Sequence, residues 1–191
     1  MIKTDSDSKI FENYCKDKDH ALEVERYSLM IFEAFSRIMN FVPEAKDYLS
    51  HAAKLHDIGY CVEKKSHHKH AMKIIIDEGI EDFTDEENLI TANIARYHRG
   101  SLPDENKHEY FAQLSAEKKL LVAQLASFLK IADGLDKPHK NLILRMRAEE
   151  TPECFNLYLK TVGFKPNLKM AEKKKDLFEY IFKKPLKFVF E

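Results

Sequence analysis

Five of the nine histidines of this chain lie within residues 51–70, and one of them, His56, stands directly before Asp57. A neutral imidazole and a carboxylate together suit divalent first-row metals. The pair comes shortly before Gly59, a residue type that often ends a helix, and consecutive residues share a site more easily at a helix end. The alternative is a group of surface histidines without a common role.

Two more side chains of the metal-ligand type lie on the apolar stripes of predicted helices. His20 begins a stripe over residues 19–40, and Asp133 lies on a stripe over 115–136. His56 ends the stripe of a third helix, which Pro43 opens. A carboxylate on a buried stripe is costly unless it is paired or bound to a metal. Each residue alone is more often a hydrogen-bonded core residue, but the combined pattern favours a metal site.

The remaining pattern predicts a mainly α-helical protein with a small C-terminal antiparallel β-sheet and one packed helix. Further helices are expected over 66–79 and over 84–100, the second with a Thr84 cap, before a polar connection over 101–115. Residues 141–163 alternate as a β-hairpin does, residues 167–184 read as a helix, and 186–190 as a last strand. We therefore expect three parts, namely an N-terminal extension, a helical domain and a small α+β subdomain: 1–16, 17–138 and 139–191.

Composition narrows the class of protein. The formal net charge is −1, with basic and acidic residues interleaved, so nucleic acid is not an expected partner. No run of 18 apolar residues and no signal peptide are present, so we expect no membrane span. The three cysteines are widely spaced without a CxxC pair, which indicates free thiols and a cytoplasmic protein. Apolar tail residues could join a homodimer interface: Phe188, Val189 and Phe190.

The order H…HD…D resembles the signature of the HD superfamily of metal-dependent phosphohydrolases. The segments "AAKLHDIGY", "HHKHA", "ARYHRG" and "KIADGLDK" further resemble the C-terminal region of the exopolyphosphatase and guanosine pentaphosphate phosphohydrolase family, from about residue 17 onward. This resemblance implies an HD-type helical bundle with one or two divalent ions (Mn, Fe, Zn or Mg). The implied ligands of the first metal are His20, His56, Asp57 and Asp133.

The same resemblance implies that histidines between the HD pair and the last aspartate hold a second metal. The candidates are His68, His70 and His98, each of which has an ordinary hydrogen-bonded histidine as its alternative. His67 fits the pattern less well. The other histidines, which lie off the stripes or in polar segments, are expected at the surface: His51, His108 and His139. The Lys-rich stretch 172–175 is expected to be a solvated helix face.

Phosphate chemistry also needs positive charge near the metal. The candidates for binding phosphate are Lys69, Arg96, Arg99 and Lys130. The alternative for each is a solvated surface charge. The first functional hypothesis is thus a phosphohydrolase that acts on a nucleotide or another small phosphate ester through metal-activated water, with Asp57 as catalytic residue.

The second hypothesis is a non-catalytic HD module that binds polyphosphate or guanosine phosphates and regulates a partner. One feature favours it, because Tyr60 stands where HD nucleotidases have an acidic residue soon after the HD pair. The retained set of ligand-type residues is evidence against a merely degenerate copy. The actin-like phosphatase module of that family carries phosphate-binding loops, and these 191 residues contain no Gly-rich loop before a helix, so polyphosphate hydrolysis by the family's usual machinery is not expected.

Overall fold

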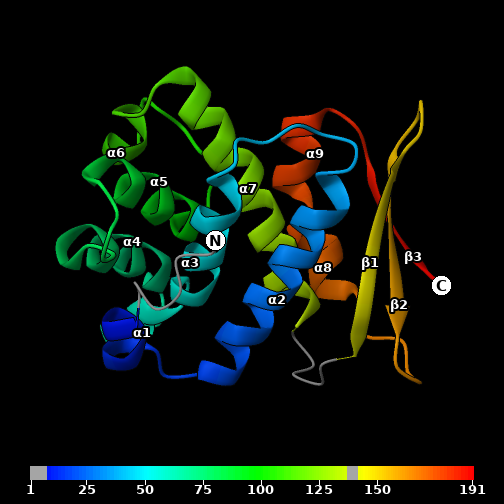
Figure 1. Cartoon of the computed structure of the whole chain (residues 1–191), viewed down its shortest axis with the longest axis horizontal. Helices are drawn as coiled ribbons and strands as arrows, with labels where there is room; N and C mark the ends of the chain where they lie inside the picture. The colour runs from blue at the N-terminus through cyan, green and yellow to red at the C-terminus, as the bar shows by residue number, and fades with distance from the viewer. Residues whose placement is uncertain (1–7, 137–141) are drawn as a thin grey trace.

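The computed structural model describes residues 8–136 and 142–191, and in this part helices precede a small sheet (Figure 1). The helices are α1 (Ser8–Tyr14), α2 (Lys18–Phe35), α3 (Ala45–Leu55), α4 (His67–Glu78), α5 (Asp85–Arg96), α6 (Glu109–Ala112), α7 (Ala116–Leu135), α8 (Lys169–Lys174) and α9 (Asp176–Phe182). A 3-10 turn, η1 (Ile58–Cys61), follows α3. The strands are β1 (Ile143–Glu150), β2 (Phe155–Thr161) and β3 (Leu186–Phe190). The predicted mainly α architecture with a small C-terminal sheet is confirmed.

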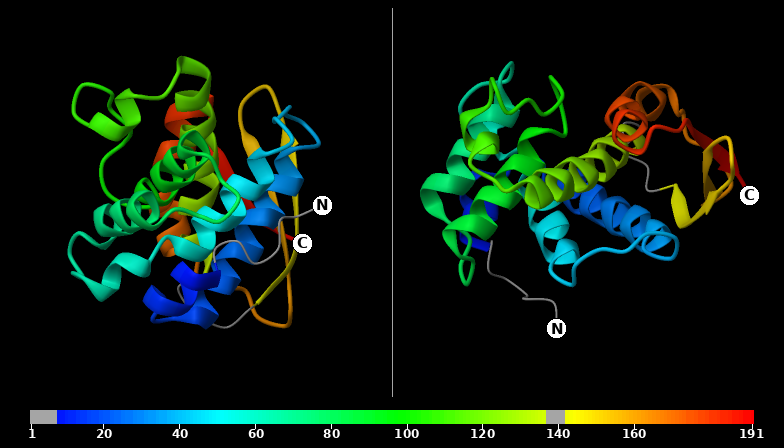
Figure 2. Two further views of the ribbon diagram at one scale, coloured as in Figure 1. Left: turned by 60° about the vertical axis from the view of Figure 1, so that its left-hand side comes forward. Right: turned by 90° about the horizontal axis from the view of Figure 1, so that it is seen from above.

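Helix α7 is the central element of the fold. It packs against α2, α3, α5, α8 and α9, and every residue from Leu125 to Leu135 is buried. A helix that is apolar on all sides belongs in the middle of a domain. The right-hand view of Figure 2 shows α7 running from the helical part toward α8 and α9, with the sheet beyond them. Any side chain near the end of α7 is therefore surrounded by other elements.

Side-chain caps fix where three helices begin. Thr84 and Glu87 form a reciprocal capping box at α5, and Ser115 accepts a hydrogen bond from the Lys118 backbone N–H at α7. Both caps agree with the sequence pattern. At α2, the Asp17 carboxylate accepts from the backbone N–H of His20 at 3.1 Å. This cap places His20 in the first turn of α2, where it is buried.

The sheet is mixed, which corrects the antiparallel prediction in part. β1 and β2 form the expected antiparallel hairpin, but β3 pairs with β2 in parallel, with Phe155 opposite Leu186 and Leu159 opposite Phe190. The chain makes a crossover through α8 and α9 between these strands, and a crossover returns a strand in the same direction. The single helix predicted over 167–184 is two short helices, separated at Lys175.

An aromatic cluster joins the helical body to the C-terminal elements. Phe35 of α2 stacks on Phe128 of α7 at 5.2 Å between ring centroids, and Phe155 of β2 lies 5.9 Å from Phe35. Phe178 of α9 lies 5.1 Å from Phe35. At the other end, the α1 residues Ile10 and Phe11 are buried against the body. The described elements thus share one hydrophobic core.

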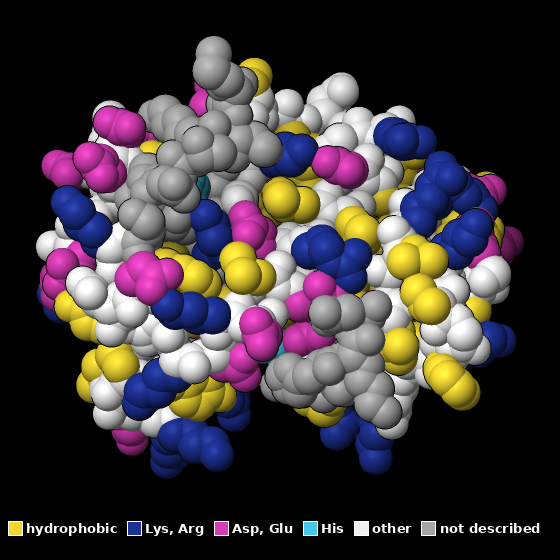
Figure 3. Space-filling view, turned by 60° about the horizontal axis from the view of Figure 1, so that its bottom comes forward, with side chains coloured by type: hydrophobic (Ala, Val, Ile, Leu, Met, Phe, Trp, Pro, Cys, Tyr) yellow, Lys and Arg dark blue, Asp and Glu magenta, His cyan; other side chains and the backbone are white. Residues whose placement is uncertain are grey.

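The surface fits the low net charge. Figure 3 shows acidic and basic side chains interspersed on the face it presents, within the part of the chain that is described. Phe188 and Phe190, the tail residues expected at an interface, are half-buried against the core. No helix in residues 8–136 or 142–191 is long and apolar enough to cross a membrane.

Candidate metal centre

Three helices bring His20, His56 and Asp133 together. Their ligand atoms all lie within 4.8 Å of one another, and all three side chains are buried. His20 comes from the first turn of α2, His56 from the end of α3, and Asp133 from the last turn of α7. His20 Nε2 lies 3.5 Å from Asp133 Oδ1. Residues 113 positions apart in the sequence therefore meet at one point, as the apolar stripes predicted.

A second group consists of His56, Asp57 and His98. Asp57 belongs to this second group and lies next to the first. The two carboxylate oxygens of Asp57 face different ways. Oδ2 lies 3.5 Å from His56 Nε2 and 3.7 Å from His20 Nε2. Oδ1 lies 3.1 Å from His67 Nε2 and 3.5 Å from His98 Nε2. This is the arrangement that a carboxylate shared between two cation sites would need.

The Nδ1 atoms of the four histidines around Asp57 each meet an oxygen atom outside the centre. A backbone carbonyl can only accept, so we assign the proton of three of these rings to Nδ1, which leaves the Nε2 lone pair facing Asp57. The four contacts are His20 to Asp136 Oδ2 at 2.6 Å, His56 to Ala53 O at 2.7 Å, His67 to Lys64 O at 2.9 Å and His98 to Ala95 O at 2.7 Å. Metal-bound histidines show this outer contact.

Two Nε2 atoms face each other within the centre. His67 Nε2 and His98 Nε2 are 3.2 Å apart, and Asp57 Oδ1 lies close to both. Because both rings use their Nδ1 proton elsewhere, two lone pairs and a carboxylate oxygen would repel one another without a cation between them. His56 Nε2 is also buried, with no hydrogen bond among the described residues. Either a proton or a metal ion would relieve this arrangement, so the residues fit a divalent cation.

The protonation states also suit metal ligands. Burial lowers the pKa of His56 to about 4 and that of His98 well below its ordinary value, so both rings are neutral at pH 7. Burial alone would raise the pKa of the Asp57 carboxyl. The surrounding histidines, His56 first, outweigh burial and hold that pKa well below its ordinary value. An ionised carboxylate among neutral imidazoles is the donor set that first-row divalent metals prefer.

Two local features hold His67 in place. An added Cβ on Gly59 would lie only 1.9 Å from the His67 backbone oxygen, so η1 packs on the start of α4 more closely than any other residue type allows. The ring of Tyr60 then stacks on the ring of His67, with 4.0 Å between centroids and 13° between planes. Tyr60, which stands where the pattern of HD nucleotidases has an acidic residue, therefore supports a histidine of the centre.

Lys174 enters the centre from α8, which corrects in part the prediction of a solvated face over 172–175, of which Glu172 and Lys173 are exposed. Its ammonium group forms an ion pair with Asp133 Oδ2, and burial lowers its pKa to about 8. The neighbouring Lys175 is half-buried and donates to the Leu186 carbonyl at 2.8 Å. Helix α8 can lie this close because of Gly134, where an added Cβ would be 2.8 Å from Ala171 Cα.

The predicted phosphate-binding residues occupy three different places. Lys130 is buried and paired with Asp176 at 2.7 Å, so a carboxylate already balances its charge. Arg99 is exposed and lies near the Tyr60 hydroxyl and Lys174, at the edge of the centre. Arg96 and Lys69 line a separate pocket.

The other histidines separate into several environments. His70 is half-exposed beside Glu63, with 3.5 Å between Nε2 and Oε2, and the structure does not bring it to the centre. His68 is buried and its ring lies 6.3 Å from that of His98. Two surface predictions are wrong, because His51 is buried beside Phe83 and His108 is half-buried.

His108 Nδ1 meets the Tyr97 hydroxyl at 2.8 Å, away from Asp57. His139, the last predicted surface histidine, lies outside the described residues.

The structure adds three residues to the predicted site, namely His67, Asp136 and Lys174. A signal for Asp136 was present in the sequence, since it lies three positions after Asp133 and thus on the same face of α7.

Comparison with known families gives one match that covers most of the chain. The family model described as Ppx/GppA phosphatase, domain III, matches residues 2–173. The match includes every residue of the two ligand groups and extends into α8. A comparison with curated proteins gave no match.

Proposed function

We propose, from the premise that the chain belongs to the Ppx/GppA phosphatase family through its domain III, that the cluster around Asp57 is the centre of a metal-dependent phosphohydrolase of the HD type. One observation carries the proposal. His67 Nε2, His98 Nε2 and Asp57 Oδ1 converge at 3.1 to 3.5 Å, while the Nδ1 atoms of both rings contact backbone carbonyls outside the centre. Such a group of acceptors calls for a cation.

The proposed cofactor is one or two divalent ions of Mn, Fe, Zn or Mg. His20, His56 and Asp133 would hold one ion, and His67 and His98 would help to hold the other, with Asp57 shared by both sites. An ion held there would polarise a phosphoryl oxygen and lower the pKa of water to near neutrality. Asp57 is thus the residue on which the proposed catalysis depends most.

The residues of the chain itself would bind and orient the substrate. The ligand side chains are buried or mostly buried, so the centre is shielded from bulk water, which strengthens charge interactions there. Lys174 and Arg99 are the cations beside it, and either could hold a phosphate oxygen. The proposed substrate is a nucleotide or another small phosphate ester. The three free cysteines are compatible with the reducing cytoplasm that we propose as the protein's location.

One observation favours the second candidate function, a non-catalytic module that binds polyphosphate or guanosine phosphates. The Lys174 ammonium already pairs with Asp133 and supplies positive charge inside the centre. A centre neutralised in this way could bind an anion without hydrolysing it. The two functions differ in whether bound phosphate ester is turned over.

The test combines metal binding with turnover. A carboxylate charge 4 Å from a divalent ion contributes about 8 kcal/mol at an effective dielectric constant of 20, and desolvation offsets part of this. Asp57→Asn should therefore weaken binding of Mn²⁺ or Zn²⁺ by about a thousandfold or more. Titration calorimetry measures this affinity. Asp19→Asn is the matched control, since Asp19 is exposed and directly precedes His20. Its affinity should equal that of the wild type.

Phosphate release from nucleotides and polyphosphate is then measured with the metal-loaded protein. The phosphohydrolase proposal expects release that a chelator and Asp57→Asn both abolish. Release that persists in either condition would contradict it. Binding of a phosphorylated compound without any release would instead favour the module.

A further inference from the structure

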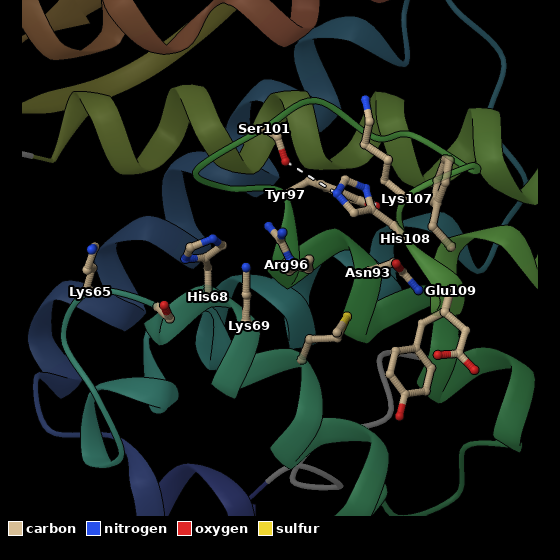
Figure 4. A pocket seen from close by; sticks show the side chains of 14 residues that line it. Lys65, His68, Lys69, Asn93, Arg96, Tyr97, Ser101, Lys107, His108 and Glu109 are labelled. Atoms are coloured by element: carbon tan, nitrogen blue, oxygen red, sulfur yellow. Dashed lines mark hydrogen bonds between the residues drawn. The ribbon is translucent and has the colours of Figure 1, made fainter.

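A pocket of about 580 Å³ lies between α4, α5 and the segment around α6 (Figure 4). Neither ligand group of the metal centre contributes a residue to its lining. His68 lies between the pocket and the metal centre, because it lines the pocket and its ring centroid is 6.3 Å from that of His98. The pocket is therefore close to the metal centre without being part of it.

The floor of this pocket holds a buried positive charge that forms no ion pair with any described carboxylate. Arg96 is 5% exposed, and its Nη1 atom has no hydrogen-bond partner among the described residues. Burial lowers the pKa of Arg96, and the neighbouring Tyr97 counteracts this effect only in part. Its guanidinium lies 5.3 Å from the ring centroid of Tyr97. A buried charge without a partner costs several kcal/mol, so a site of this kind is built for a ligand that supplies the missing negative charge.

The other groups in the pocket point to the same type of ligand. His68 is 8% exposed, and its Nδ1 atom also has no partner within the described chain. Lys65 and Lys69 stand at the rim, and neither forms an ion pair with a described residue. Among the described lining residues, Glu109 is the only acid, and Figure 4 shows it on the opposite side from Lys65 and Lys69.

We propose that this pocket is a phosphate-binding site, with Arg96 as the central hydrogen-bond donor and His68, Lys65 and Lys69 around it. Guanidinium groups match the oxygens of phosphate with paired donors, and additional cations suit its charge of up to −2. The volume exceeds what one phosphate ion fills, and Met72, Tyr110 and Phe111 supply an apolar side. The ligand is thus either free phosphate or the phosphate group of an organic ester. The proposal does not depend on metal binding at Asp57.

The test is calorimetric titration of the full chain in the presence of a chelator, with inorganic phosphate, adenosine monophosphate and adenosine as probes. Phosphate and the nucleotide should bind, and adenosine should not. Tighter binding of the nucleotide would identify an organic ester as the ligand, and equal binding would identify free phosphate. Absence of binding by both phosphate-containing probes would overturn the proposal.

Variants locate the site. Arg96→Met keeps an unbranched apolar stem without the guanidinium group and should weaken phosphate binding by about tenfold or more, since charge-assisted hydrogen bonds are lost. The double variant Lys65→Ala with Lys69→Ala removes exposed residues and should weaken binding in any case, even if Arg96→Met does not fold. Lys160→Ala, an exposed lysine of β2, is the matched control. Unchanged affinity in the double variant would overturn the proposal.

A last variant separates this pocket from the metal centre. In the presence of chelator, Asp57→Asn should bind phosphate as the wild type does. If it does not, phosphate binds at the metal centre, and the assignment to the Arg96 pocket is wrong. This outcome differs from a failure of the proposed hydrolase, which concerns turnover with metal present.

Discussion

Acidification should destabilise the metal-free protein, because His56 is buried in its neutral form. Burial lowers the pKa of His56 to about 4, from an ordinary value of about 6.5. Between these values the unfolded chain takes up a proton that the folded protein does not. Stability that is fully present above pH 6.5 is therefore lost as the pH falls toward 4. From pH 7 to pH 5, His56 alone accounts for about 2 kcal/mol.

Two other histidines act in the same direction. Burial lowers the pKa of His98 well below its ordinary value and that of His68 to about 4. The pKa of the Asp57 carboxyl, held low by His56 and its other neighbours against the effect of burial, extends the loss to still lower pH. The total loss between pH 7 and pH 5 should therefore exceed the contribution of His56.

Urea unfolding at pH 7 and pH 5, in the presence of a chelator, measures this loss. With a slope of about 2 kcal/mol per M, the His56 contribution alone lowers the midpoint by about 1 M. His56→Gln should reduce the difference between the two pH values by about 2 kcal/mol. His70→Gln, at a half-exposed position outside the centre, is the control for a histidine substitution as such. An equal difference in His56→Gln and the wild type would refute the reasoning, as would a gain of stability on acidification.

Three other predictions concern the surroundings of the centre. Lys174→Met should tighten binding of Mn²⁺ in a titration by about tenfold, since an ammonium group no longer competes for Asp133, and weaker binding would contradict that role. Asp136→Asn should weaken metal binding by about 10- to 100-fold while thermal unfolding stays two-state, because this carboxylate orients the α2 histidine from outside the centre. Gly134→Ala should lower the free energy of unfolding by about 1–3 kcal/mol, because its Cβ would press on Ala171, and an unchanged melting temperature would show that α8 can move away.

The longer helices of the body and the first candidate ligand group could be predicted from the sequence because both follow from periodicity, whereas the short helices α1 and α6 were not predicted. A side chain on an apolar stripe must face the core, so His20, His56 and Asp133 were identifiable before their distances were known. The caps at Thr84 and Ser115 were local signals of the same clarity. Local patterns are reliable when one element alone determines the outcome.

Features that depend on two elements at once could not be predicted in this way. His67 and His68 open α4, and which ring faces Asp57 depends on how closely η1 packs on that helix at Gly59. The direction of β3 depends on the crossover before it and not on its five residues. His51 lies on α3, yet Phe83, outside any helix or strand, covers it.

Lys174 shows why the C-terminal elements belong in any account of the centre. Its position on α8 is fixed by the contact between Gly134 and Ala171, and its charge is balanced by Asp133, a metal-ligand candidate. A cation that binds at Asp133 must therefore displace or reposition the Lys174 ammonium group, which the packing of α8 holds beside Asp133. Metal binding at Asp133 and the packing of α8 on α7 are therefore thermodynamically coupled. It follows that loosening α8 and removing the Lys174 charge should both strengthen metal binding. Both should also destabilise the metal-free fold, the second because the buried Asp133 carboxylate loses an ion-pair partner.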